Sequence, residues 1–203
     1  MSQRAGLDRD QIIQTAAKMA DEWGLEQVTI ANLAKKLGVR SPSLYNHVNG
    51  LQEIRLLLAV HALQLLQQQM TCALADRSSG SASSSPEETI HALGKAYLDF
   101  ARTHPGLYEA GLLRAMDKEH QEIQRQSEKL VGLFVNTLAQ YELQGDEAIH
   151  AVRGLRCLFH GFATLEQQGG FGIPVDPDAS FVSMIDTFLS GLQLKSERTQ
   201  NSL

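Results

Sequence analysis

The sequence predicts an all-α protein, and three observations support this prediction. Nearly every long stretch repeats its apolar residues at helical spacing, and no stretch alternates apolar and polar residues as a strand does. Several of the expected helices also start or stop at typical capping residues. The 203 residues can bury a sizeable core in one or two domains. We expect a boundary after residue 50, which gives an N-terminal segment 1–50 and a C-terminal segment 51–203.

The first two expected helices have clear ends. The first begins at the N-cap Asp8 and runs to Trp23, where Gly24 ends it. The second is short, is capped by Thr29 and is ended by Gly38. The apolar face of the first helix consists of Ile12, Ile13, Ala16, Ala20 and Trp23. The apolar face of the second consists of Ile30, Leu33, Ala34 and Leu37.

A third helix of about eight residues is expected after a tight turn at Gly38. Ser41 and Pro42 open it, because serine suits the N-cap and proline suits the first helical position. Asn49-Gly50 ends it. Leu44 and Val48 would point into a three-helix core together with Val39. The outward side and the amino end would then carry Arg40, Ser41, Ser43, Tyr45, Asn46 and His47.

Longer helices fill the rest of the chain. They are expected over 51–75, 86–103, 105–115, 117–142, 145–168 and 177–193. A low-complexity loop, 77–86, separates the first two of these helices, and Ser85 with Glu88 forms a capping box at its end. Residues 169–174 read as a second loop, and the last ten residues are expected to be frayed.

The distribution of charge is more informative than the net charge of −5. Residues 1–51 carry 6 basic and 5 acidic groups, which gives +1, and the remainder carries 12 basic and 18 acidic groups, which gives −6. Three of the bases, Lys35, Lys36 and Arg40, gather around the expected third helix. The asymmetry is compatible with a nucleic-acid contact in the first segment.

Several classes of protein are disfavoured. No apolar run reaches the roughly 18 residues of a membrane span, and the N-terminal residues lack a secretory signal, so we expect a cytoplasmic protein. The histidines show no metal-binding spacing on a helix, and Gly169-Gly170-Phe171-Gly172 follows a helix rather than a strand. We therefore expect neither an enzyme nor a metal or cofactor. Cys72 and Cys157 are expected to be buried, reduced thiols.

The residues around the expected third helix suit contact with DNA. In a helix-turn-helix, the N-terminal residues of the second helix meet base edges, while the preceding helix crosses the backbone. Arg40 can pair with guanine or phosphate, Asn46 can pair with adenine, and Ser43 can serve either role. Tyr45, His47 and Thr29 are natural donors to phosphate. The alternative is a helix-turn-helix that serves packing alone, with Tyr45 and His47 as ordinary surface residues.

Residues 8–51 resemble the DNA-binding domain of the TetR/AcrR family of transcriptional regulators. The resemblance lies in Val28-Thr29, in Leu33-Ala34-x-x-Leu37-Gly38-Val39 and in Leu44-Tyr45-x-His47-Val48, in order and at the family's spacing. It implies that operator-contacting positions are occupied by Thr29, Arg40, Ser41, Pro42, Ser43, Tyr45, Asn46 and His47.

The C-terminal part resembles, less sharply, the WHG subgroup of that family. The resemblance lies in His104-Pro105-Gly106-Leu107-Tyr108, in Phe159-His160-Gly161, where Phe159 replaces the usual tryptophan, and in Gly170-Phe171-Gly172. It implies that helices 145–168 and 177–193 form a homodimer interface. Their apolar stripes, which we expect to serve the intramolecular core as well as the interface, are Ala151, Leu155, Leu158 and Phe162 on the first, and Phe181, Ile185, Phe188, Leu189 and Leu192 on the second.

The same resemblance implies a pocket for a small-molecule effector. It would lie between the helix from residue 51 and the helices over 86–142. The candidate lining residues, for each of which a plain structural role is the alternative, are Tyr97, Phe100, Tyr108, Met116, Phe134, Arg156 and His160. The predicted function is a dimeric repressor that binds operator double-stranded DNA and is released by this effector. A helical ligand carrier or adaptor without DNA binding is the alternative.

Overall fold

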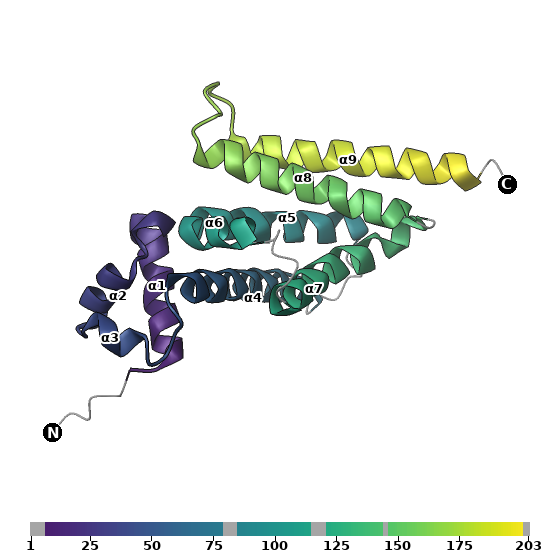
Figure 1. The fold of residues 1–203 in the computed structure, drawn as a ribbon. Coiled ribbons are helices and arrows are strands. Elements are labelled where there is room, and N and C mark those ends of the chain that lie inside the picture. Colours follow the sequence, from purple (N-terminus) through teal and green to yellow (C-terminus); the bar gives the residue numbers. More distant parts are fainter. Residues whose placement is uncertain (1–6, 79–84, 115–120, 144–145, 201–203) are drawn as a thin grey trace. The chain divides into compact units, whose positions relative to one another are not determined.

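A computed structural model describes residues 7–78, 85–114, 121–143 and 146–200. Within these ranges the secondary structure is helical, as the sequence predicts (Figure 1). The α-helices are α1 (Arg9–Trp23), α2 (Ile30–Leu37), α3 (Ser41–Leu44), α4 (Leu51–Ser78), α5 (Pro86–Thr103), α6 (Pro105–Arg114), α7 (Gln121–Leu138), α8 (Glu147–Gln167) and α9 (Pro177–Gln200). Two short 3₁₀ helices, η1 and η2, span Leu25–Gln27 and Ala139–Tyr141. No helix in the described ranges combines the length and the apolar character needed to cross a bilayer.

The chain divides into two compact units. The first unit is Met1–Leu65 with Thr103–Ser127, and the second unit is Leu66–Arg102 with Glu128–Leu203. Both α4 and α7 therefore contribute residues to both units. The functional division after residue 50 is a separate matter and stays a prediction.

The predicted caps explain where several helices begin and end. Asp8 accepts a hydrogen bond from the Gln11 amide at 2.7 Å, and Thr29 accepts one from the Asn32 amide at 3.1 Å. Gly38 ends α2 in the left-handed conformation, with φ at 68°, which costs a glycine little. The Ser85 hydroxyl likewise accepts from the Glu88 amide at 3.2 Å.

The prediction of an eight-residue third helix is wrong. Helix α3 has only 4 residues, with Arg40 as its N-cap and Ser41 as its first helical residue. Residues 45–47 continue as a turn, in which the His47 amide donates to the Leu44 carbonyl at 2.9 Å. Asparagine and glycine favour turns over helix interiors, so the run from Asn46 to Gly50 does not prolong the helix.

Four further expectations are corrected. Trp23 is 49% exposed rather than part of the apolar face of α1, and both Cys72 and Cys157 are exposed free thiols on α4 and α8. Helix α7 begins at Gln121 and ends at Leu138, inside the expected range. Helix α9 extends to Gln200. The prediction of a frayed end is therefore wrong for residues 194–200.

The second unit has an aromatic core around the fully buried Phe159 of α8. Its ring centroid lies 5.8 Å from that of Tyr97, 5.9 Å from that of Phe134 and 5.5 Å from that of Phe181. Gly94 of α5 makes room for this packing, because a Cβ there would lie 3.0 Å from Cζ of Phe159. The core thus joins α5, α7, α8 and α9.

Candidate nucleic-acid interface and effector residues

The inward face of the helix-turn-helix is apolar and buried, as predicted. Leu33 and Leu44 are fully buried, and Ala34 and Val48 are almost so. Val39 is half-buried, and its amide donates to the Ala34 carbonyl at 3.0 Å in the turn between α2 and α3. Helix α2 is therefore packed against both α1 and α3.

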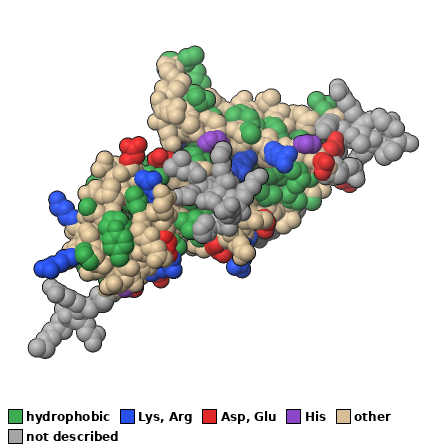
Figure 2. Space-filling view, in the orientation of Figure 1, with side chains coloured by type: hydrophobic (Ala, Val, Ile, Leu, Met, Phe, Trp, Pro, Cys, Tyr) green, Lys and Arg blue, Asp and Glu red, His purple; other side chains and the backbone are tan. Residues whose placement is uncertain are grey.

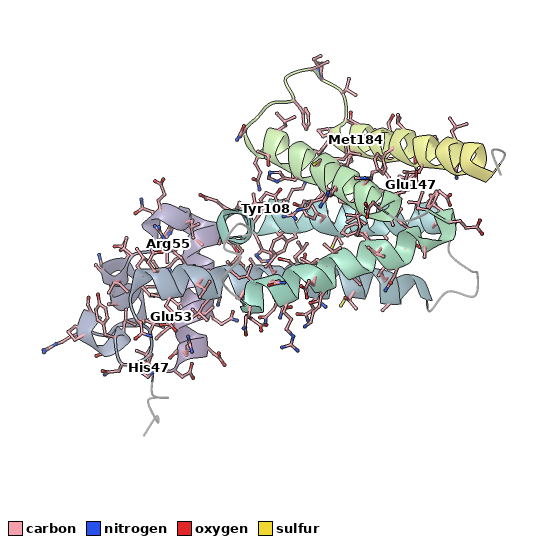
Figure 3. The ribbon with its side chains drawn as sticks, turned by 45° about the vertical axis from the view of Figure 1, so that its right-hand side comes forward. His47, Glu53, Arg55, Tyr108, Glu147 and Met184 are labelled. Carbon is pink, nitrogen blue, oxygen red and sulfur yellow. The ribbon has the colours of Figure 1, made fainter. Side chains whose placement is uncertain are left out.

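The predicted DNA-contacting residues lie on the other side of this packing. Tyr45 is 57% exposed, and Arg40, Pro42 and Asn46 are also exposed. Thr29, Ser41, Ser43 and His47 are partly exposed. All eight predicted residues are therefore at least partly open to solvent, and Figure 3 labels one of them, His47.

One of the three expected bases, Lys36, contacts the end of α1. The Lys36 ammonium lies 4.4 Å from the centroid of the Trp23 ring and 3.5 Å from a carboxylate oxygen of Glu22. Lys35, Lys36 and Arg40 are all exposed.

Sequence reasoning missed a contact that fixes the turn after α3. Glu53 in the first turn of α4 (Figure 3) forms an ion pair with Arg9 of α1 and accepts a hydrogen bond from the Asn49 amide at 2.5 Å. The turn with Asn49 and Gly50 is thereby tied to both helices. A glutamate early in a helix that follows Asn-Gly was a usable signal for the bond to Asn49, but nothing local indicated Arg9 as a partner.

A second missed contact joins α1 to α6 within the first unit. One carboxylate oxygen of Asp21 lies 2.8 Å from Nδ1 of His104, and the other accepts from the Leu107 amide at 3.0 Å. Gly106 lies directly against the Ala20 backbone, where a Cβ would overlap the carbonyl group. Asp21 and His104 are 83 residues apart in the sequence, so no local pattern could have predicted their contact.

His61 of α4 lies in the electrostatic surroundings of the same contact. Burial lowers the pKa of His61, the charge of His104 lowers it further, and the charge of Asp21 raises it in part. The neutral imidazole is therefore the favoured form in the folded protein.

Two of the predicted effector residues share an aromatic partner. Tyr97 and Phe134 both pack on Phe159, and Phe100 is also buried in the second unit. Tyr108 is buried in the first unit, on α6 (Figure 3). Met116 lies outside the described residues.

The two predicted polar anchors of the effector lie on α8. Arg156 is exposed, and His160 is half-buried with Nδ1 3.4 Å from the Thr164 hydroxyl. Burial lowers the pKa of His160, and the charge of Arg156 lowers it further. Among the described residues, no group of three or more His, Cys, Asp or Glu side chains could hold a metal ion.

Comparison with known proteins gives consistent results. Residues 90–188 match the family model for the tetracyclin repressor-like C-terminal domain. The chain is 42% identical, over 97% of its length and 98% of the relative, to the uncharacterized HTH-type transcriptional regulator YobS of Bacillus subtilis. It is 27% identical, over 95% of its length and 84% of the relative, to the uncharacterized HTH-type transcriptional regulator Rv0681 of Mycobacterium tuberculosis.

Solved structures share the fold. A protein with unknown function from Rhodococcus sp. RHA1 superposes with a TM-score of 0.79 at 21% identity, covering 95% of this chain and 100% of that one. The transcriptional regulator SCO7222, a TetR from Streptomyces coelicolor, superposes with a TM-score of 0.65 at 18% identity. The superposition covers 93% of this chain and 98% of that one.

Proposed function

Because the chain belongs to the TetR/AcrR family of transcriptional regulators, we propose that it is a cytoplasmic repressor that binds operator DNA as a homodimer. A small molecule bound by the C-terminal part releases it. The effector acts by binding the DNA-incompetent conformation better than the competent one, because a ligand with equal affinity for both would shift nothing.

One observation carries the DNA-binding part of the proposal. The tip of the helix-turn-helix combines a buried apolar side, formed by residues such as Leu44 and Val48, with an exposed polar side at Arg40, Tyr45 and Asn46. Exposure of these polar groups is what contact with base edges and phosphate requires. A major groove of about 12 Å width admits such a tip.

The roles follow from side-chain chemistry. Arg40 and Asn46 would read guanine and adenine edges, with Ser41, Pro42 and Ser43 beside them at the amino end of α3. Tyr45 and His47 would donate to phosphate. The Thr29 hydroxyl accepts from Asn32 as a cap, and its own hydrogen can still be donated to a phosphate oxygen.

The effector would be a small, largely apolar molecule. Aromatic side chains predominate among its candidate contacts, which include Tyr97 and Phe134 against Phe159 in the second unit. The exposed guanidinium of Arg156 and the imidazole of His160 would hold a polar group of the effector.

The test is selection of bound fragments from genomic DNA, followed by affinity measurements at several salt concentrations. A DNA-binding regulator recovers a defined sequence, and the logarithm of its affinity falls with the logarithm of salt concentration. A double variant, Tyr45→Ala with Asn46→Ala, should lose the selected sequence, whereas Gln64→Ala at an exposed position of α4 should retain it. A flat salt dependence and no recovered sequence would favour the carrier or adaptor alternative.

Repression and release need a separate measurement. A reporter gene placed behind a selected operator should be expressed less when the protein is present. Addition of the effector should restore expression. A reporter whose expression rises with the protein would make it an activator.

A further inference from the structure

Exposed apolar side chains are concentrated on one pair of helices. In the part of the chain that the structure describes, the large apolar side chains with substantial exposure, apart from Trp23 and Tyr45, all lie on α8, on α9 or between them. The most exposed are Ile173 at 76% and Val175 at 60%, in the connecting segment 168–176. Figure 1 shows this segment extending away from the α8–α9 pair, and Figure 2 shows hydrophobic atoms at its tip.

The connecting segment has a defined conformation. Gly169 takes a φ of 70° at the end of α8, and the Gly170 amide donates to the Leu165 carbonyl at 2.7 Å. Farther along, the Phe171 ring packs on Phe162 with 4.7 Å between centroids. The exposure of its apolar tip is therefore a feature of a fixed structure.

The base of the segment is clamped to α5. Arg102 donates to both carboxylate oxygens of Glu166, at 2.6 and 2.8 Å, and to Asp178 at 2.5 Å. The hydrogen bond from Arg102 lowers the pKa of the Asp178 carboxyl. The Gln167 side chain donates to the Ala101 carbonyl at 2.8 Å. Both ends of the segment are thus fixed, which reduces the entropy that would be lost on binding a partner.

The apolar stripes that the sequence offered to a dimer are largely used inside the protomer. Leu155, Phe181 and Ile185 are buried in the second unit. The exposed positions of α8 include charged groups such as Arg153, and its exposed large apolar side chains are Ile149 and Leu165. The exposed positions of α9 are mostly small or polar residues, and its exposed large apolar side chains are Val182 and Leu194. The two most exposed apolar side chains, Ile173 and Val175, lie in the connecting segment instead.

The charges suggest how the segment could add to a contact between two copies. Arg153 and Arg156 of α8 are exposed and form no ion pair within the described ranges. Asp176, at the end of the connecting segment, is exposed and likewise pairs with no base there. Ile149, an exposed apolar residue near the start of α8, lies one turn before Arg153. One end of α8 therefore offers an apolar and a basic group, and the segment offers an apolar tip and an acid.

We propose that the connecting segment of one chain packs on the first turns of α8 in a second copy, with Ile173 and Val175 against the partner's Ile149 and Asp176 near the partner's Arg153. In a twofold dimer each copy makes the same contact, and two α8 helices that cross the axis run antiparallel. The end of one α8 then lies beside the beginning of the other. The inference rests on the proposed homodimer and assigns one apolar contact of that dimer to the connecting segment.

Sedimentation equilibrium of the full chain tests this inference. The double variant Ile173→Ser with Val175→Ser should raise the dissociation constant of the dimer by at least roughly tenfold, because two aliphatic side chains leave a buried contact. The matched control, Leu194→Ser, removes an exposed apolar side chain of α9 and should change the constant by less than about twofold. Circular dichroism should show the helices unchanged, since all three residues are exposed.

Cross-linking tests the position of the contact. In a background of Cys72→Ser and Cys157→Ser, a chain with Ile173→Cys is mixed with a chain with Ile149→Cys and oxidised. A disulfide-linked heterodimer is expected, and the control pair Leu194→Cys with Ile149→Cys should give none.

The outcomes separate the two proposals. A monomeric wild-type chain would remove the homodimer and the inference together. If the wild-type chain is a dimer, three results would each overturn the inference alone. The double serine variant could leave the dissociation constant unchanged, or Leu194→Ser could raise it by as much. The third result is the absence of a disulfide between residues 173 and 149.

Discussion

Arg40 and Tyr45 lie at the two ends of the short helix α3, and their side chains suit different contacts. Arg40 precedes the first helical residue, and its guanidinium carries a fork of donors that matches the two acceptors of a guanine edge. Tyr45 follows the last helical residue and offers a single hydroxyl, which suits a phosphate oxygen. Removing each should therefore have a different effect on sequence preference.

Arg40→Ala should weaken operator binding by about 1–3 kcal/mol and relax the preference at one base pair, as loss of a bidentate base contact does. Binding to operators with single base-pair substitutions measures both effects. If the variant keeps the preference of the wild type at every position, Arg40 contacts the DNA backbone instead.

Tyr45→Phe should weaken binding to every sequence by a similar factor, by about 0.5–1.5 kcal/mol, because it removes one donor to phosphate and leaves base readout intact. The same set of substituted operators serves as the measurement. A selective loss at a single base pair would show that the hydroxyl reads a base.

His61 makes stability depend on pH. Its folded-state pKa lies below the ordinary value of 6.5, so the unfolded chain binds a proton more readily. The free energy of unfolding should therefore fall as the pH drops through 6.5 towards the lowered pKa of the folded state. Urea unfolding at several pH values should show a smaller fall for His61→Gln. His150→Gln, at an exposed site on α8, is the control, and an equal effect of both variants would exclude His61 as the cause.

At the scale of elements, the contact between α1 and α6 depends on the absence of a side chain at Gly106. The backbone of α6 lies against Ala20 of α1 there, and Asp21 adds hydrogen bonds to His104 and to the Leu107 amide. The position of α6 within the first unit is thus set by backbone contact as well as by side chains.

Gly106→Ala should destabilise the protein by about 1–3 kcal/mol or more, because the added Cβ would force the two backbones apart. Gly132→Ala on α7 is a matched control, since a Cβ there meets no atom within 4 Å. In that helix interior alanine should stabilise by about 0.5–1 kcal/mol. Denaturant unfolding of both variants checks this, and equal stabilisation by the two substitutions would contradict the close approach at Gly106.

The sequence predicted those elements whose ends are encoded locally. Asp8, Thr29 and Ser85 cap helices where expected, because each needs only a backbone amide three residues away. The predicted end of α3 was too late in the sequence. Leu44 and Val48 are four residues apart, and this spacing fits a short turn after the helix as well as a longer helix. The full length of α9 could not be read from a C-terminal stretch with little apolar patterning.

The exposure of the candidate site residues could be predicted from the sequence, but their tertiary contacts could not. Exposure of Tyr45 and Asn46 followed from the helical positions of their buried neighbours. Helical periodicity put Trp23 on the buried face of α1, but Trp23 is half-exposed. The amphipathic pattern of one helix does not show how far the helices packed against it extend. The contact between Lys36 and Trp23 depends on tertiary structure and had no local signal.

At the scale of the whole molecule, the proposed dimer must hold two recognition tips at a spacing that fits the DNA helix. Two half-sites read on the same side of the duplex lie about 34–36 Å apart, or a multiple of that distance. The α8–α9 pairing and the connecting segment would then bear on operator choice as well as on assembly.

Insertion of about five base pairs between the half-sites of a selected operator should weaken binding by at least roughly tenfold, because it turns one half-site to the opposite face of the duplex. Electrophoretic mobility shift measures the loss, and the same insertion outside the operator is the control. Unchanged affinity would mean that each chain binds its half-site independently.

The chain has a single tryptophan, and the structure puts it at the outer edge of the helix-turn-helix. Trp23 is half-exposed, and the Lys36 ammonium rests over its ring at the end of α2. All tryptophan fluorescence therefore comes from Trp23, and a displacement of Lys36 from its ring would change the emission. The protein thus has an intrinsic optical probe next to α2 of the helix-turn-helix, and the proposed binding to DNA can be tested without any label.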